Sequence, residues 1–132
     1  MKNFEDFLKK LEASKSAVEK GVQKGVHKAG ILVEGDAKSI CAVDTGQLRT
    51  SINTQVETKG TKTVANIGTN VEQGIYIEFG TGQQGDQSVP HNLNWKGMKP
   101  QPFLRPAFDH NVNSGNVDVI IKDEISKELR RL

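Results

Sequence analysis

The sequence predicts an α+β fold in a single domain: a long N-terminal helix, a small antiparallel sheet of three to four strands, and one or two C-terminal helices. Apolar residues recur at three- or four-residue steps over residues 1–41 and again over residues 103–132, which is the period of one helical face. Within residues 47–79 they alternate with polar residues, as in half-buried strands. A chain of 132 residues fits one domain.

The first segment, residues 1–41, is expected to form one long amphipathic helix. Several acid and base pairs stand four residues apart with the acid first, the favourable order for ion pairs on a helix surface. Glu5 with Lys9 and Glu34 with Lys38 are examples. The apolar stripe of this helix consists of Phe4, Leu8, Leu11, Val18, Val22, Val26, Ala29, Val33, Ala37 and Ile40.

A ridge of very small residues at four-residue spacing runs beside that stripe. Each glycine within a helix costs about 1 kcal/mol relative to alanine, so the ridge needs an explanation. One explanation is close approach by another helix, which makes Gly21 and Gly25 possible interface residues; the other is a kink or two shorter helices. The ridge consists of Ala13, Ala17, Gly21, Gly25 and Ala29.

Three strands are expected after the long helix. Residues 51–58 and 63–69 alternate in the manner of half-buried strands, and the tetrapeptide at 59–62, Lys-Gly-Thr-Lys, suits a hairpin turn between them. Residues 75–79, Ile-Tyr-Ile-Glu-Phe, form a third short strand or the strand-like end of a turn.

Residues 80–102 show no period and are expected to form a mobile loop, which in a small domain is usually functional. Trp95 in this loop is either an interface anchor or a side chain that folds back over its own sheet. A helix then begins near Phe103, with Pro106 in its first turn, and a second begins after residues 113–116. The stripe of the last helix consists of Val117, Ile121, Ile125, Leu129 and Leu132.

Composition excludes several classes of protein. Lys and Arg number 18 against 16 acidic residues, so the net charge of +2 gives no field that would attract nucleic acid or membranes. The single cysteine, Cys41, cannot close a disulfide within the chain. The N-terminus lacks a basic and apolar signal, and no segment is long enough to span a membrane. We therefore expect a protein that stays soluble inside a cell.

The run Asp44-Thr45-Gly46 raises an alternative function, because a hydrophobic-Asp-Thr-Gly loop carries the catalytic aspartate of aspartic proteases. A chain with one such loop would have to dimerise, as retroviral-type enzymes do, so that two copies of Asp44 share a proton. Such an enzyme also needs an almost all-β framework, and here Asp44 follows a long helical pattern. We expect no enzyme, and interpret Asp44 as a turn or helix-terminus residue.

Other motifs carry little chemistry. The GxGxxG at 80–85 lacks the following helix that a dinucleotide site needs, and three scattered histidines do not have metal-ligand spacing. We expect no cofactor and no metal. A DNA-binding alternative would use a basic row and the basic C-terminus, although near-zero net charge counts against specific nucleic-acid binding. Its residues are Lys20, Lys24, Lys28, Arg130 and Arg131.

Three segments, taken in order after a long helix, resemble the tail-completion or head-tail joining proteins of tailed bacteriophages and prophages. They are DTGQLRTSI at 44–52, YIEFGTG at 76–82 and PQPFLRPAF at 100–108. The resemblance covers residues 1–112, whereas residues 83–99 match least. The motif residues are Asp44, Thr45, Gly46, Leu48, Arg49, Glu78, Phe79, Gly80, Thr81, Gly82, Phe103, Leu104, Arg105 and Pro106.

The resemblance implies a structural protein without catalytic activity at the phage neck. Copies in a ring-like homo-oligomer around the tail axis would contact tail proteins and the head-side connector. The protein would reside in the host cytoplasm during assembly and then in the virion.

The resemblance also implies roles for the motif residues. Asp44 and Gly46 form the turn after the long helix, and Leu48 and Ile52 enter the core. Glu78 and Phe79 end the central strand, Phe103 and Leu104 pin the next helix to the sheet, and Arg105 reaches a carboxylate such as Glu78 or a neighbouring subunit.

Overall fold

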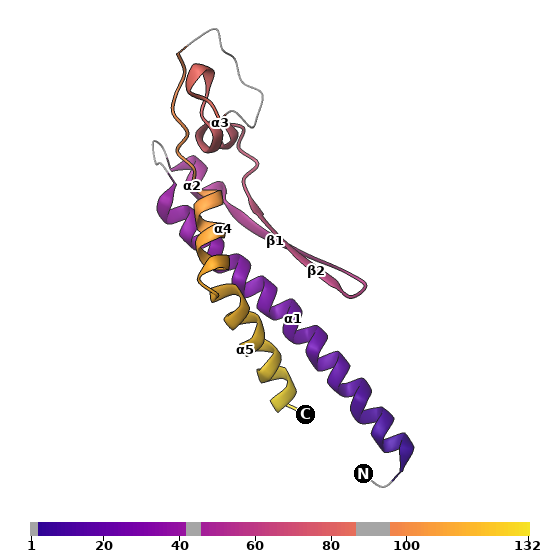
Figure 1. Ribbon diagram of the computed structural model, residues 1–132. Coiled ribbons are helices and arrows are strands. Elements are labelled where there is room, and N and C mark those ends of the chain that lie inside the picture. Colours follow the sequence, from indigo (N-terminus) through magenta and orange to yellow (C-terminus); the bar gives the residue numbers. More distant parts are fainter. Residues whose placement is uncertain (1–2, 42–45, 87–95) are drawn as a thin grey trace.

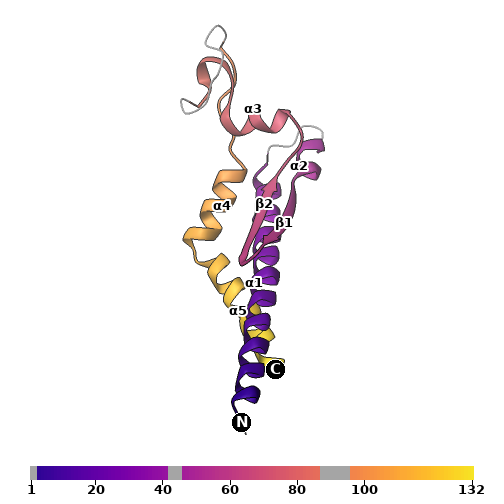
Figure 2. The same cartoon turned by 90° about the vertical axis from the view of Figure 1, so that its right-hand side faces the viewer.

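The computed structural model describes residues 3–41, 46–86 and 96–132, which form an elongated body built along one helix (Figure 1). The hairpin and the two C-terminal helices flank that helix on different sides (Figure 2). Its N-terminal end and α3 lie at opposite ends of the molecule. The elements are α1 (Phe4–Ile40), α2 (Gln47–Ser51), β1 (Asn53–Lys59), β2 (Lys62–Gly68), α3 (Gln73–Phe79), the 3-10 helix η1 (Gly82–Gln84), α4 (Leu104–Asn113) and α5 (Asn116–Arg130).

The long helix α1 is continuous over 37 residues, so the sequence-based alternative of two shorter helices is wrong. The Asn3 side chain caps its first turn by accepting a hydrogen bond from the Asp6 amide at 3.0 Å. Glu5 and Asp6 in the first turn and Lys38 in the last complement the helix dipole. With 1.5 Å of rise per residue, α1 is about 55 Å long.

The small-residue ridge of α1 allows close packing with α5 of the same chain. A Cβ atom added at Gly21 would lie 2.5 Å from the Ile125 Cα atom, and one at Gly25 would lie 2.7 Å from the Ile121 Cα atom. No side chain larger than hydrogen fits at that separation. The glycines of α1 therefore bring the two helix backbones together, and the lost helix propensity is offset by the contact.

Two ion pairs flank this contact. Lys24 Nζ lies 2.5 Å from Glu128 Oε1, and Lys28 Nζ lies 2.5 Å from Glu124 Oε1. Both glutamate side chains are only 8% exposed, so the lysines supply the partner that a covered carboxylate requires. Hydrogen bonds from Lys28 and Lys24 hold the pKa values of Glu124 and Glu128 below their ordinary value, against the opposing effect of burial.

The sheet is a single antiparallel hairpin of two strands, with Val56 opposite Ala65 and a two-residue turn at Gly60 and Thr61. Gly60 has a φ of 60°, a left-handed conformation that suits glycine. The predicted turn is confirmed. The hairpin rests on α1 through Thr54, whose hydroxyl donates to the Gly30 carbonyl at 3.1 Å.

The prediction of three to four strands is wrong, because residues 75–79 belong to helix α3 and the described residues contain only β1 and β2. The Thr69 hydroxyl accepts a hydrogen bond from the Val71 amide, and this turn leads into α3. Ile77 and Glu78 are adjacent yet both buried, at 9% and 4% exposure. A strand would place them on opposite faces, so burial of both selects the helix over the β propensity of the segment.

The C-terminal part forms two helices, as expected, and the break between them contains Gly115 at a φ of 83°. The core lies where α1, α2, α3 and the start of α4 meet. It includes Leu48 and Ile52, which were expected there, and Phe103, which was expected to contact the sheet. The remaining members are Val33, Ala37, Cys41, Ile77 and Ala107.

The apolar stripe predicted for α1 is buried only in its C-terminal part. Ala29, Val33 and Ala37 are buried, whereas Phe4 is 70% exposed and Leu11 50% exposed. The first buried residue of α1 is Ala17. The N-terminal part of the stripe has no cover within the described chain, because α5 packs at Gly21 and Gly25 and ends beside the middle of α1 (Figure 1).

Replacing Gly25 with valine should destabilise the protein by about 1–3 kcal/mol, because the added side chain overlaps the backbone of α5. Gly35 is the matched control, since a Cβ there meets nothing within 4 Å. Gly35→Ala should stabilise the helix by up to about 1 kcal/mol. Urea unfolding of both variants measures the difference; equal stability would contradict the close-packing argument.

Acid should weaken the attachment of α5. A carboxyl whose pKa is lowered on folding stabilises the protein above its unfolded pKa, and that stability is lost as the pH falls through the lowered folded value. For Glu124 and Glu128 the loss begins near the ordinary value of 4.5 and continues below it. We expect urea midpoints to fall over this range in the wild type. The urea midpoint should fall less with acid in the variant Lys24→Gln/Lys28→Gln, which lacks both lysine partners. If the midpoint of this variant depends on pH as that of the wild type does, the ion pairs do not stabilise the fold.

Candidate functional site

The buried carboxylate of Glu78 joins α3 to the beginning of α4. Its Oε2 atom accepts hydrogen bonds from the amides of Phe103 at 2.7 Å and Leu104 at 3.4 Å, and its Oε1 atom accepts one from Arg105 at 2.9 Å. The next residue, Pro106, has no amide hydrogen to satisfy. Glu78 therefore caps α4 from a different helix, in place of the side-chain cap that Phe103 does not provide.

Arg105 strengthens the same junction. Its Nε atom lies 3.4 Å from Glu78 Oε1, and its Nη2 atom donates to the Glu78 carbonyl at 3.0 Å. The guanidinium also lies 4.7 Å from the centre of the Phe79 ring and bonds Asp86 Oδ2 through Nη1 at 3.1 Å. Glu78 is thus one of the two partners expected for Arg105, and Asp86 is a further partner that the sequence did not indicate.

The two ends of the segment 80–102 are tied together. Gly80 has a φ of 75°, and a Cβ there would lie 2.7 Å from the Met98 carbonyl oxygen. The amides and carbonyls of Thr81 and Met98 exchange two hydrogen bonds, at 2.8 and 3.2 Å. Gln84 donates to the carbonyls of residues 96 and 97. Residues 80–86 and 96–102 therefore form a stem, in which the two ends of the segment are hydrogen-bonded to each other.

The first motif adjoins the same region. Gly46 begins α2 with a φ of 82°, and Leu48 is buried beside Gly74 of α3. Arg49 Nη2 donates to the Cys41 carbonyl at 3.4 Å, which ties α2 to the end of α1. Asp44 and Thr45 lie outside the described residues. The described parts of all three motifs thus meet at one end of the molecule, around Leu48 and Phe103.

The possible interface residues have different positions. Gly21 and Gly25 lie under α5 of the same chain, and Trp95 lies outside the described residues. Sequence reasoning missed Asp86 and Gln84, which hold the stem, because their partners are distant along the chain. In the sequence, only the position of Gln84 and Asp86 directly after the second motif could have indicated a role for them.

The geometry does not favour the alternative functions. The described residues contain one two-stranded hairpin and not the β framework that an aspartic protease built on Asp44 would need. Residues 82–84 form a 3-10 turn where a dinucleotide site would need an α-helix. Lys24 and Lys28 of the basic row pair with glutamates of α5, which reduces the positive field available to DNA.

The described residues also lack the common requirements of reactive and membrane sites. Burial raises the pKa of the Cys41 thiol, against the opposing charge of Arg49, so the thiolate is disfavoured. No group of three or more potential ligands (His, Cys, Asp, Glu) is close enough to hold a metal ion in the part that the structure describes. In the same ranges, no helix has the length and apolar character needed to cross a membrane.

Glu78→Ala should destabilise the protein by about 2–4 kcal/mol, because it removes the acceptor of three amides and leaves Arg105 without one of its carboxylates. Glu57 on β1 is exposed and is the matched control, whose replacement by alanine should cost less than about 0.5 kcal/mol. Chemical unfolding of the two variants decides the point. A Glu78→Ala protein as stable as the control would show that the cap is dispensable.

Residues 2–80 match the family described as "Bacteriophage HK97-gp10, putative tail-component". This match spans α1, α2, the hairpin and α3, and includes the first motif and residues 76–80 of the second. No curated protein and no solved structure matches the chain. The chain belongs to the HK97 gp10-like family of bacteriophage tail components.

Proposed function

We propose that this tail component acts at the head-tail junction, where copies arranged as a ring around the tail axis complete the tail or join it to the head-side connector. The family supports a structural role in the tail. The ordered set of three motifs supports the narrower role at the neck. The ring, the connector contact and residence first in the host cytoplasm and then in the virion neck are parts of this proposal.

The observation that carries the proposal is the junction made by Glu78 and Arg105. It fixes α4 to α3 and, through Asp86, also holds the stem from which the segment 87–95 emerges. This stem lies at one end of the elongated molecule, far from the N-terminal end of α1 (Figure 1). A protein that joins two assemblies needs separate surfaces for its own copies and for another protein, and the two ends provide them.

The stem supports a role of residues 87–95 in binding a specific partner. In the resemblance to neck proteins residues 83–99 match least, and hydrogen bonds of Gln84 and between Thr81 and Met98 hold the two ends of this segment together. A variable segment on a fixed support is a common way to give one scaffold different partners. Trp95 is the residue of this segment that we expect to anchor the contact.

Replacing residues 87–95 with a Gly/Ser linker of equal length tests this role. Asp86 and Lys96 stay in place, so the stem and the unfolding temperature should be retained. In a phage or prophage that lacks the natural gene, the variant should yield unjoined heads and tails by electron microscopy, and few infectious particles. A surface variant of α5, Asp118→Ser/Lys122→Ser, is the control. Normal particle yield from the linker variant would reject the segment as the joining surface.

A further inference from the structure

The N-terminal end of α1 carries a patch of large apolar side chains, which we call the apolar tip: Phe4, Phe7, Leu8 and Leu11. Their exposed fractions are 70%, 40%, 43% and 50%. The rings of Phe4 and Phe7 lie side by side, with centres 6.3 Å apart. The area left in water is about 400 Å², within the size range of patches that usually have a function.

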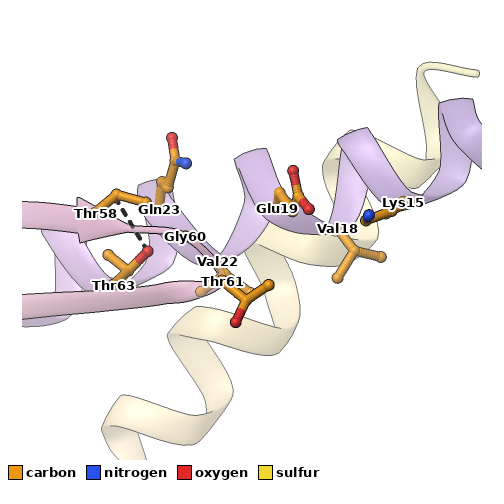
Figure 3. A pocket seen from close by; sticks show the side chains of 9 residues that line it. All are labelled: Lys15, Val18, Glu19, Val22, Gln23, Thr58, Gly60, Thr61 and Thr63. Carbon is orange, nitrogen blue, oxygen red and sulfur yellow. Dashed lines mark hydrogen bonds between the residues drawn. The ribbon is translucent and has the colours of Figure 1, made fainter.

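A groove lies farther along the same helix, between α1 and the turn of the hairpin (Figure 3). Val18 and Val22 of α1 supply its apolar wall, and Thr58, Thr61 and Thr63 face them from the hairpin. The volume of this hairpin groove is about 380 Å³. A cavity of about 150 Å³ holds one benzene molecule, so the groove has room for about two phenyl rings.

The first turn of the tip and the hairpin turn also match in charge. The first turn of the tip carries the carboxylates of Glu5 and Asp6, whereas the hairpin turn is flanked by the amines of Lys59 and Lys62. These opposite charges favour contact between the two places and help to orient it.

The tip cannot fill the groove of its own chain. Leu11 and Val18 belong to one continuous helix, which separates them by about 10 Å along its axis. A second copy can bring its tip to the groove without such a constraint. Because tip and groove are different surfaces, the contact is head-to-tail, and its repetition produces a closed ring or an open filament.

The exposed surface of the chain agrees with two such contacts per copy. The chain exposes 8983 Å², whereas a compact monomer of 14.5 kDa exposes about 6,900 Å². The difference is about 2,100 Å², and two interfaces of standard size bury about 1,600 Å² of each copy. We infer that the apolar tip of one copy inserts into the hairpin groove of the next, which supplies the self-association on which the proposed function rests.

The first experiment replaces the aromatic pair. Sedimentation velocity and native mass spectrometry compare the wild type with Phe4→Ser/Phe7→Ser up to about 1 mM, where even weak association is measurable. The control, Ile31→Ser/Val119→Ser, removes two other exposed apolar side chains, which are 47% and 67% exposed. We expect the tip variant to raise the dissociation constant at least about tenfold while the control leaves it unchanged. Circular dichroism checks that each variant is folded.

The second experiment distinguishes tip-to-groove contact from tip-to-tip contact. Lys59→Glu/Lys62→Glu alone and Glu5→Lys/Asp6→Lys alone should each weaken association, whereas an equimolar mixture should restore it. A tip-to-tip contact predicts instead that the hairpin variant associates normally. Disulfide formation gives a further check in a Cys41→Ala background: Leu8→Cys and Thr61→Cys proteins should cross-link when mixed and not when each is alone.

The outcomes separate this inference from the proposed function. If the wild type associates and the tip variant associates equally well, the tip-to-groove contact is rejected and the ring survives by another surface. If the wild type does not associate at any concentration, both the contact and the ring are rejected. If the linker variant of residues 87–95 keeps the contact but does not join heads to tails, the two surfaces act independently, as we infer.

Discussion

The arrangement of this chain depends on one buried carboxylate, that of Glu78. It is 4% exposed, and it replaces the lost hydration with three backbone amides at the beginning of α4 and with the guanidinium of Arg105. Burial of a carboxylate is favourable only when hydrogen bonds use nearly all of its acceptor positions. Because the donors to Glu78 belong to the beginning of α4, these hydrogen bonds fix the position of α4 relative to α3. The direction of the C-terminal helices and the position of the stem both follow from it.

The rest of the molecule is held by contact with α1 and not by a large core. Few large side chains are fully buried among the described residues, notably Phe103 and Ile52. The hairpin touches α1 where Gly30 admits the Thr54 methyl group, and α5 touches it where Gly21 and Gly25 admit its backbone. Small residues along one helix thus replace the interior of a compact domain, and much apolar surface remains in water.

Sequence reasoning succeeded where local patterns determine structure. The hairpin turn depends on Gly60, and the resemblance of the first motif correctly implied the burial of Leu48 and Ile52. It failed for residues 75–79, where β-rich composition suggested a strand and tertiary burial of both Ile77 and Glu78 selected a helix. The glycine ridge correctly indicated close approach, but the partner could not be named, because the position of α5 depends on contacts about 100 residues distant along the chain.

The candidate site shows the same limit. A pair between Arg105 and Glu78 could be anticipated because both belong to the motifs, whereas Asp86 and Gln84 had no pattern to mark them. Their role is visible only once the two ends of the segment 80–102 are seen to meet. Nor does periodicity distinguish the buried part of the α1 stripe from its exposed part. Phe4 and Val33 obey the same helical spacing, and they differ because α1 extends beyond the elements that pack against it. The apolar stripe of α1 is therefore longer than the elements that pack on it. Its exposed part is available for contact with another protein and is not needed for the fold of the chain.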